Sequence, residues 1–202
     1  MIRNVLKFVV ILGLVCIVMG SGVAILYGLW QARIDAREAA TRQAAIHAVA
    51  PQGATVDVTS PVAGTAGTET AVYAARDGTG QPVAYVAAGA AQGYASTVRV
   101  MVGATPAANR LVVHKVVVTA QAETPGLGAN VAEQQSTYTL WQKLFGSDQP
   151  EAVFNPFLDR FAGKPRQEVA DIQAITAATI TSNATKQAVG QALERIENAI
   201  RP

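Results

Sequence analysis

The longest hydrophobic pattern in the chain is an uncharged stretch of 23 residues, 8–30. As a helix rising about 1.5 Å per residue, this stretch exceeds the ~30 Å hydrocarbon core of a bilayer. Basic residues precede it, and Tyr27 and Trp30 lie at its far end, where aromatic residues often anchor a helix at the interface. The apolar region of a cleaved secretory signal is usually much shorter. We therefore predict a short tail at 1–7 and a retained transmembrane helix at 8–30.

Small residues form a regular pattern within this helix, because Gly20, Ala24 and Gly28 recur every four positions on one face. Such spacing allows a second helix to approach closely, but glycine and alanine are also common in membrane helices, and both interpretations stay open. Cys16 is interpreted as an ordinary apolar residue of the span. Positive charges flank the span on both sides and favour neither orientation strongly. Because the tail is short, we expect the larger part of the chain to be translocated.

The region after the span divides into a helical extension and a domain. Residues 31–53 are alanine-rich and predict a juxtamembrane helix, which Pro51 and Gly53 bring to an end. Residues 54–202 are predicted to form the domain. Its first part, 54–68, is rich in glycine, threonine, serine and proline, and indicates a linker or an irregular entry.

Four segments of the domain have the β-branched or alternating character of strands: 69–76, 82–88, 97–102 and 111–119. The first two are joined by Asp-Gly-Thr-Gly at 77–80, which predicts a hairpin. The last is rich in valine, and its hydrophobicity predicts a central place in the sheet.

Helical periodicity follows the strands. A helix is predicted at 131–145, with an apolar side made of Tyr138, Trp141, Leu144 and Phe145. An aromatic cluster that we interpret as core comes next, at Phe154, Phe157, Leu158 and Phe161. After a short apolar stretch at 169–175, the last helix carries an amphipathic stripe of Val189, Leu193, Ile196 and Ile200. These elements predict an α+β domain built on an antiparallel sheet with flanking helices.

Composition narrows the class of protein. Half of the 202 residues are hydrophobic and 15% are charged, which argues against a disordered chain and against an ordinary, well-solvated enzyme. Residues 31–202 carry equal numbers of basic and acidic side chains, so no basic field for nucleic acid is expected. The single cysteine excludes an intrachain disulfide and a multi-cysteine metal site. His47 and His114 have no evident catalytic or metal partner and are interpreted as structural, so we expect no catalytic residues and no metal site.

Two segments remain as candidates for chemistry. In the first, 175–182, hydroxyl side chains come immediately before the last amphipathic stripe. They are suited to capping the free N–H groups of a first helical turn, but the same N–H groups and the helix dipole suit a phosphate. Ala177 and Ala178 add no bulk there. The second segment, 123–128, has the sequence Glu-Thr-Pro-Gly-Leu-Gly and is either a simple tight turn or backbone that contacts the polar edge of a heterocycle.

The membrane anchor, the turn at 123–128 and the sequence Thr-Ala-Ala-Thr-Ile-Thr-Ser at 176–182 occur in that order. Together they resemble the FMN-binding family that includes the G subunit of the Rnf electron-transport complex. The C subunit of the sodium-pumping NADH:quinone reductase is a relative in the same family. Gly93-Tyr94 and the Phe-Ala-Gly-Lys sequence at 161–164 also fit.

The resemblance implies a covalent FMN on the last threonine of a Ser/Thr-Gly/Ala-Ala-Thr sequence, which is Thr179 in this chain. It implies that the neighbouring residues and the turn at 123–128 surround the cofactor. The cofactor residues assigned in this way are Thr179, Thr176, Ala177, Ala178, Thr181, Glu123, Thr124, Gly126, Leu127 and Tyr94. One departure is Gln173, where the family often has aspartate; Asp171 lies two residues further back. If the flavin transferase needs a carboxylate at that spacing, attachment in this chain is inefficient or absent.

On this resemblance we expect an electron-transfer subunit of a membrane-bound Rnf-type complex that couples ferredoxin and NAD redox chemistry to ion translocation. The domain at 54–202 would face the extracytoplasmic side of the bacterial cell membrane. Its partners would be the other membrane subunits and the flavin transferase. The chain would be one redox station of a translocase and not a catalyst alone, and an electron relay needs no general base. The alternatives are the C-type subunit of a sodium-pumping quinone reductase and a cofactor-free membrane assembly protein.

Overall fold

The computed structural model describes residues 2–107, 110–133, 135–137 and 152–201. The chain forms two compact units that divide between Thr41 and Arg42. The first unit contains most of α1 (Ile2–Val49), and the second contains the end of α1 and every later element.

Helix α1 includes the whole predicted span. Among the described residues, the helical stretch Lys7–Val49 is long and apolar enough to cross a membrane, and the side chains of its most apolar window are not buried. After the uncharged stretch 8–30, Gln31 Nε2 donates a hydrogen bond to Asp35 Oδ1 at 2.9 Å, one helical turn away. The helix ends at Val49 and not at residue 53, because Pro51 disfavours helical backbone at the residue before it.

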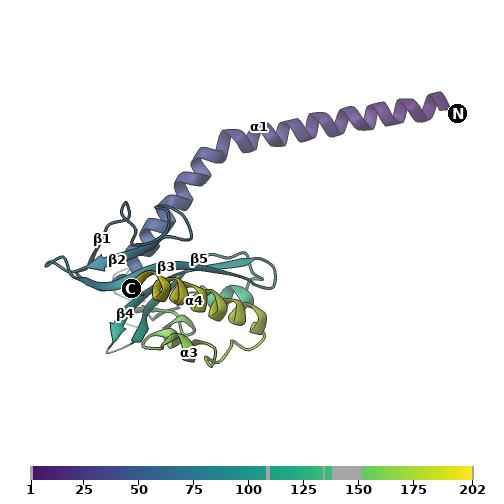
Figure 1. Cartoon of the computed structure of the whole chain (residues 1–202). Coiled ribbons are helices and arrows are strands. Elements are labelled where there is room, and N and C mark those ends of the chain that lie inside the picture. Colours follow the sequence, from purple (N-terminus) through teal and green to yellow (C-terminus); the bar gives the residue numbers. More distant parts are fainter. Residues whose placement is uncertain (1, 108–109, 134, 138–151, 202) are drawn as a thin grey trace, which may run out of the picture. The chain divides into compact units, whose positions relative to one another are not determined.

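The second unit is built on one antiparallel sheet, visible in Figure 1. Its strands are β1 (Thr55–Val56), β2 (Val72–Arg76), β3 (Pro82–Gln92), β4 (Thr97–Ala107) and β5 (Arg110–Ala120). They lie side by side in chain order, each antiparallel to the next. The four predicted strands and the antiparallel α+β class are confirmed; the short β1 lies in the segment predicted to be irregular.

The predicted hairpin between β2 and β3 is present, and Asp77 explains its turn. Asp77 Oδ1 accepts hydrogen bonds from the backbone N–H groups of Thr79 at 2.9 Å and Gln81 at 3.0 Å. A short acidic side chain that binds backbone N–H groups ahead of it is typical of tight turns.

The prediction of a central place for the valine-rich strand is wrong, because β5 lies at the edge of the five-stranded sheet. Its hydrophobicity has another cause. Val113 and Val116 are buried in the core, and the backbone of 163–164 covers part of the outer edge. Val113 N donates to Lys164 O at 3.0 Å, and Gly163 N donates to Val113 O at 2.8 Å. An edge strand that is covered in this way has the composition of an internal one.

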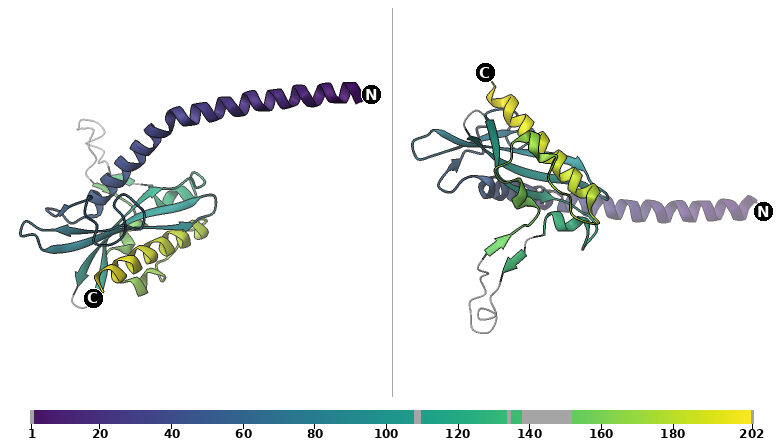
Figure 2. Two further views of the ribbon diagram at one scale, coloured as in Figure 1. Left: turned by 45° about the horizontal axis from the view of Figure 1, so that its top comes forward. Right: turned by 90° about the horizontal axis from the view of Figure 1, so that it is seen from below.

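Both faces of the sheet are covered, and α4 (Thr179–Ile200) covers one of them, as Figure 2 shows. Its predicted stripe is confirmed at Val189, Leu193 and Ile196, which are buried, whereas Ile200 at the helix end is partly exposed. Close approach requires Gly89 in β3, since a Cβ there would collide with the carbonyl oxygen of Ala188.

The last turns of α1 lie against the sheet in a second core cluster, to which Ala45, Ile46 and Val49 contribute. Gly103 in β4 is required there, because a Cβ at this position would collide with the carbonyl oxygen of Val49. The end of α1 is therefore an integral part of the domain core and not a linker.

Short elements connect β5 to α4. They are η1 (Gly128–Val131), β6 (Gln135–Thr137), β7 (Ala152–Phe154), η2 (Leu158–Phe161) and α3 (Arg166–Val169). The aromatic cluster is core at Phe157, Leu158 and Phe161, and the rings of Phe157 and Phe161 meet edge to face with centroids 5.4 Å apart.

The helix predicted at 131–145 is not present where the structure describes that region. Residues 135–137 form β6, which pairs antiparallel with β7. This pairing is a long-range contact that local periodicity does not report. The remaining part of the predicted helix, with Tyr138, Trp141, Leu144 and Phe145, lies outside the described residues.

Candidate functional site

Helix α4 begins at Thr179, inside the segment 175–182 that the sequence indicated. The residue before the helix is Ala178, and the helix start has no side-chain capping hydrogen bond. The capping role considered for the hydroxyls of 175–182 is therefore absent, and the first-turn N–H groups lie at the positive end of the helix dipole without a side-chain capping hydrogen bond.

Backbone strain is located at the same place. Ala177 has φ +64°, and it is the one non-glycine residue with positive φ in the described part of the chain. An alanine in this left-handed region is less favourable than glycine by about 1–2 kcal/mol. The chain therefore makes a sharp, strained turn immediately before α4.

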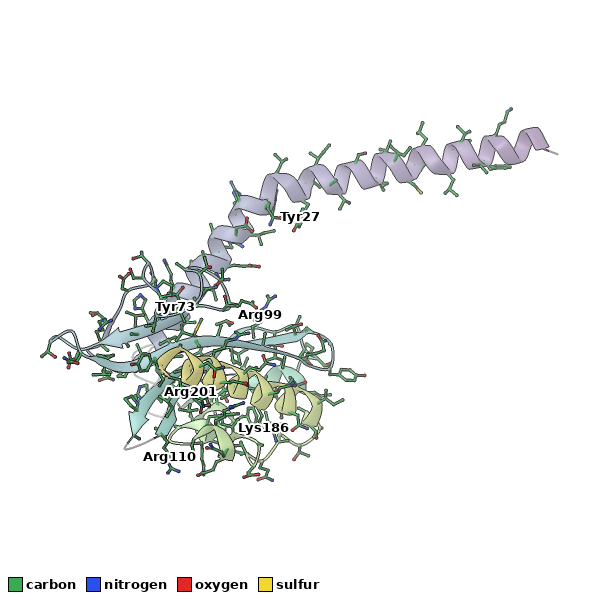
Figure 3. All side chains as sticks on the ribbon, in the orientation of Figure 1. Tyr27, Tyr73, Arg99, Arg110, Lys186 and Arg201 are labelled. Carbon is green, nitrogen blue, oxygen red and sulfur yellow. The ribbon has the colours of Figure 1, made fainter. Side chains whose placement is uncertain are left out.

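Contacts from three side chains hold the segment that leads to this turn. Lys186 Nζ, on α4, donates to the carbonyl oxygens of Ala170 at 3.0 Å and Ile172 at 3.1 Å; Figure 3 labels Lys186. Arg160 donates to the carbonyl oxygen of Gln173 at 3.2 Å. The backbone N–H of Ile175 donates to Ser182 Oγ at 3.0 Å. The approach to α4 is thus fixed at several points.

The four hydroxyl side chains of the 176–182 segment differ in environment. Ser182 and Thr181 are buried and hydrogen-bonded, Ser182 by the N–H of Ile175 and Thr181 by donating to Glu123 Oε2 at 2.7 Å. Thr176 and Thr179 are exposed. Two hydroxyls therefore serve the fold, and two face solvent.

Glu123 is buried, with 6% of its surface exposed. Its carboxylate accepts hydrogen bonds from the backbone N–H groups of Tyr94, Ala95 and Ser96 at 3.2, 3.1 and 2.8 Å. Ser96 Oγ donates at 3.2 Å and Thr181 Oγ1 at 2.7 Å. Burial alone would raise the pKa of Glu123, but these hydrogen bonds outweigh it and hold the pKa below the ordinary glutamate value. The group is therefore an ionised carboxylate that joins the turn between β3 and β4 to the first turn of α4.

Two glycines make room for this carboxylate. A Cβ on Gly93 would lie 2.5 Å from Glu123 Oε1 and 2.8 Å from the carbonyl oxygen of Ser96. A Cβ on Gly128 would lie 2.8 Å from Thr181 Oγ1 and 2.9 Å from Glu123 Oε2. No side chain fits at either position without displacing the hydrogen-bonded group, which explains both glycines.

A cleft of about 520 Å³ opens beside Glu123. It is lined by three chain segments that are distant in sequence: Tyr94; Glu123, Thr124, Leu127 and Gly128; and residues 177–181. Five large hydrophobic side chains after α1 are exposed in the described part of the chain, and three of them line this cleft: Tyr94, Leu127 and Ile180. The cleft thus combines an apolar, exposed rim with the uncapped start of α4.

The structure brings together eight of the ten residues assigned to the cofactor, from Tyr94 to Thr181. The other two lie elsewhere. Thr176 lines a neighbouring polar cleft of about 340 Å³ together with Arg160 and Gln173. Gly126 does not line the cleft; it has φ +74° and forms the turn instead.

The sequence placed Gly128 near the cofactor only as the end of the turn at 123–128, and it did not assign Ile180 or Ser96 to the site. Ile180 lies inside the motif at 176–182 and could have been found there. Ser96 was identifiable only from its contact with Glu123, which is 27 residues away in sequence.

A third cleft, of about 630 Å³, is lined by His47, His114 and Lys115 near the end of α1. Among the described residues there is no group of three or more side chains of the metal-binding types. His47 and His114 therefore line the same cleft but belong to no such metal-binding group among the described residues.

Comparison with known proteins identifies a family for this part of the chain. Residues 93–194 match a family model described as an FMN-binding domain. Over 124 residues the chain is 30% identical to the G subunit of the proton-translocating ferredoxin:NAD(+) oxidoreductase complex of Clostridium ljungdahlii, a match that covers 61% of this chain and 58% of that relative. The chain thus spans less than two thirds of the relative's length. The crystal structure of Shewanella oneidensis NqrC is similar over 72% of this chain and 66% of that one, with a TM-score of 0.41 and 18% identity.

Proposed function

The chain belongs to the FMN-binding domain family, and on that premise we propose that it is a membrane-anchored electron-transfer subunit carrying FMN on Thr179. The linkage would be a phosphoester between Thr179 Oγ1 and the FMN phosphate. We propose that the subunit works in an Rnf-type complex that couples ferredoxin and NAD redox chemistry to ion translocation. When bound, FMN supplies the electron-carrying chemistry, and the protein supplies its position and electrostatic environment.

The described residues of the cleft fit such a group in two respects. Tyr94, Leu127 and Ile180 offer exposed apolar surface, which suits the flat faces of a flavin ring. The start of α4 has no side-chain cap, and its dipole favours a phosphate at that point. The small side chains of Ala177 and Ala178 allow a phosphorylated group to approach the backbone.

The observation that carries the proposal is the state of the four hydroxyls in the 176–182 segment. Thr181 and Ser182 are buried and committed to hydrogen bonds, so neither is available without local rearrangement. Thr176 is exposed but lines the neighbouring cleft. Thr179 alone among the four is exposed and also lines the cleft with the apolar rim. The geometry therefore supports the same hydroxyl that the sequence motif suggests.

Attachment requires a partner enzyme, because a threonine hydroxyl does not react with FMN unaided. We expect a flavin transferase to use a flavin nucleotide whose phosphoanhydride bond breaks as the Thr179 oxygen–phosphorus bond forms. The hydroxyl proton and a nucleoside monophosphate would be released. Gln173 and Thr176 line the same neighbouring polar cleft. A transferase that approaches this cleft would meet Gln173 where the family often has an aspartate.

The membrane role rests on α1. We propose that residues 8–30 cross the bilayer once, after a tail at 1–7 and before a juxtamembrane helix within 31–53. The domain beginning near residue 54 would lie on the extracytoplasmic side. The other membrane subunits of the complex would be its electron donor and acceptor. Membership in a sodium-pumping quinone reductase is the alternative, in which cofactor and site are the same but the partners differ.

The direct test is flavin fluorescence of the denatured chain on a gel, after production in membranes that contain a flavin transferase. We expect a fluorescent band for the wild-type chain and none for Thr179→Ala. Thr176→Ser is the matched control, because it changes the other exposed hydroxyl residue of the segment but keeps a residue type that the motif has at this position, and it should keep the fluorescence. A non-fluorescent wild-type band, or a fluorescent Thr179→Ala band, would refute the attachment.

The cofactor-free assembly role is separated by a second measurement on the whole complex. If the chain carries electrons, Thr179→Ala abolishes electron flow while the complex still assembles. If it serves assembly alone, Thr179→Ala leaves electron flow intact.

A further inference from the structure

Glu123 is the one charged side chain among the described residues that line the cleft. No basic side chain of the cleft lining neutralises it. Its partners are N–H and O–H groups, which stabilise the carboxylate through their dipoles but leave its net charge in place. A buried charge of this kind is screened by salt much less than an exposed one.

The surrounding donors select a carboxylate over an amide. Oε2 accepts from the backbone N–H of Tyr94, and Oε1 accepts from the backbone N–H groups of Ala95 and Ser96. A glutamine has one acceptor oxygen, so its NH₂ group would face a backbone N–H on one side. The chain thus maintains a negative charge where a neutral side chain of the same shape would satisfy the fold less well.

The same carboxylate fixes the geometry of the cleft. It joins the turn at 93–96 to Thr181 on α4, and therefore holds Tyr94 and the first turn of α4 on either side of the opening. Gly93 and Gly128 admit it between these segments. Glu123 therefore both fixes the geometry of the cleft and supplies its negative charge.

We propose that Glu123 is a positioning residue whose charge also sets the electrostatic potential of the cleft, so that the cofactor there is harder to reduce than it would be beside a neutral side chain. The inference rests on the proposed function, because it concerns a flavin held at Thr179. The physical reason is that adding an electron next to a fixed negative charge is unfavourable.

A matched pair of variants separates charge from structure. Glu123→Gln removes the charge and keeps the length of the side chain, whereas Glu123→Asp keeps the charge and withdraws the carboxylate from Thr181 and from the turn at 93–96. We would load the full-length chain with covalent flavin and measure its midpoint potential by spectroelectrochemical titration. The midpoint potential is expected to rise in Glu123→Gln and to stay close to that of the wild-type protein in Glu123→Asp.

Two results would overturn the inference: an unchanged potential in Glu123→Gln, or an equal shift in both variants, which a merely structural role would produce. If Glu123→Gln folds poorly, the comparison is made in an Ala177→Gly background, with Ala177→Gly alone as the reference. A wild-type chain without covalent flavin refutes the proposed function. A flavin-loaded chain whose potential ignores the charge refutes this inference alone.

Discussion

The two sides of the cleft differ in how completely their polar groups are used. On the closed side, the Glu123 carboxylate, Thr181 and Ser96 are joined by hydrogen bonds, and Gly93 and Gly128 pack closely against the carboxylate. On the open side lie the exposed side chains of Tyr94, Leu127, Thr179 and Ile180, beside the strained backbone of Ala177.

This difference separates the residues that serve the fold from the residues that are available to a ligand. The polar side chains of the closed side are joined by hydrogen bonds, so a change there is expected to lower folding stability. The side chains of the open side are exposed, so a change there is expected to affect folding stability little and to alter cofactor attachment. Substitutions on either side of the cleft, and a change of pH, therefore test that division.

Gly93→Ala should destabilise the domain most. The added Cβ would lie 2.5 Å from Glu123 Oε1 and 2.8 Å from a backbone oxygen, and we expect a loss of about 1–3 kcal/mol. Urea unfolding at neutral pH measures it. Gly190→Ala, in the middle of α4, is the control: apart from the helix's own adjacent backbone, no atom lies within 4 Å of the new Cβ, and the substitution should stabilise the domain by about 0.5–1 kcal/mol. Equal stability of Gly93→Ala and wild type would remove the steric basis of the closed side.

Thr181→Val should cost about 1–3 kcal/mol, because Glu123 loses its one donor from α4 while remaining buried and charged. Thr179→Val has the same change of side chain on the open side, and its unfolding free energy should stay within about 0.5 kcal/mol of wild type. Flavin attachment should show the opposite pattern, lost in Thr179→Val and kept in Thr181→Val. If both variants lose equal stability, the two sides are not distinct.

Lowering the pH should destabilise the folded domain, because Glu123 on the closed side becomes protonated. Its pKa in the folded domain is below the unfolded value of about 4.5, so its stabilising contribution is complete above that value. The contribution is lost as the pH falls through the folded pKa. Stability measured from neutral pH downward should therefore fall more steeply in wild type than in Glu123→Gln. Asp57 and Asp77, whose pKa values are also lowered by hydrogen bonds to nearby threonines, are present in both chains and cancel in the comparison. Parallel curves for the two proteins would contradict a lowered pKa of Glu123 in the folded domain.

Ala177→Gly should stabilise the domain slightly, by about 0.5–1 kcal/mol, because glycine adopts positive φ without strain. Ala178→Gly is the control: Ala178 has φ −131° and is buried, so the substitution should destabilise the domain by a similar amount. Thermal unfolding of the two variants decides the sign. Destabilisation by Ala177→Gly would argue against strain at the entry to α4.

The fold was predictable where local pattern and tertiary environment agree. The hairpin at 77–80 and the stripe of Val189, Leu193 and Ile196 follow from turn chemistry and helical period. The edge position of β5 does not, because its outer edge is covered by residues 163–164, about fifty positions later in the chain. The strand at 135–137 was not predicted for the same reason, because its partner strand lies at 152–154.

The site was predictable as two motifs but not as one structure. The sequence indicated Thr179 and the turn at 123–128, and the residues of both lie around one cleft. It did not indicate that the Glu123 carboxylate joins α4 to the β3–β4 turn, because hydrogen bonds across 27 to 58 residues leave no periodic signal. It also did not indicate the positive φ of Ala177, which alanine rarely adopts.

The central claim is that one hydroxyl, on the open side of the cleft, bears the cofactor. Tryptic cleavage after Arg166 and Lys186 yields the peptide 167–186, which contains five hydroxyl residues, including Thr176, Thr179 and Thr181. Fragmentation mass spectrometry of this peptide from native membranes assigns the modified residue directly. We predict the mass of FMN less one water, on Thr179 and on no other residue. An unmodified peptide, or an adduct on Thr176, Thr181 or Ser182, would contradict the account.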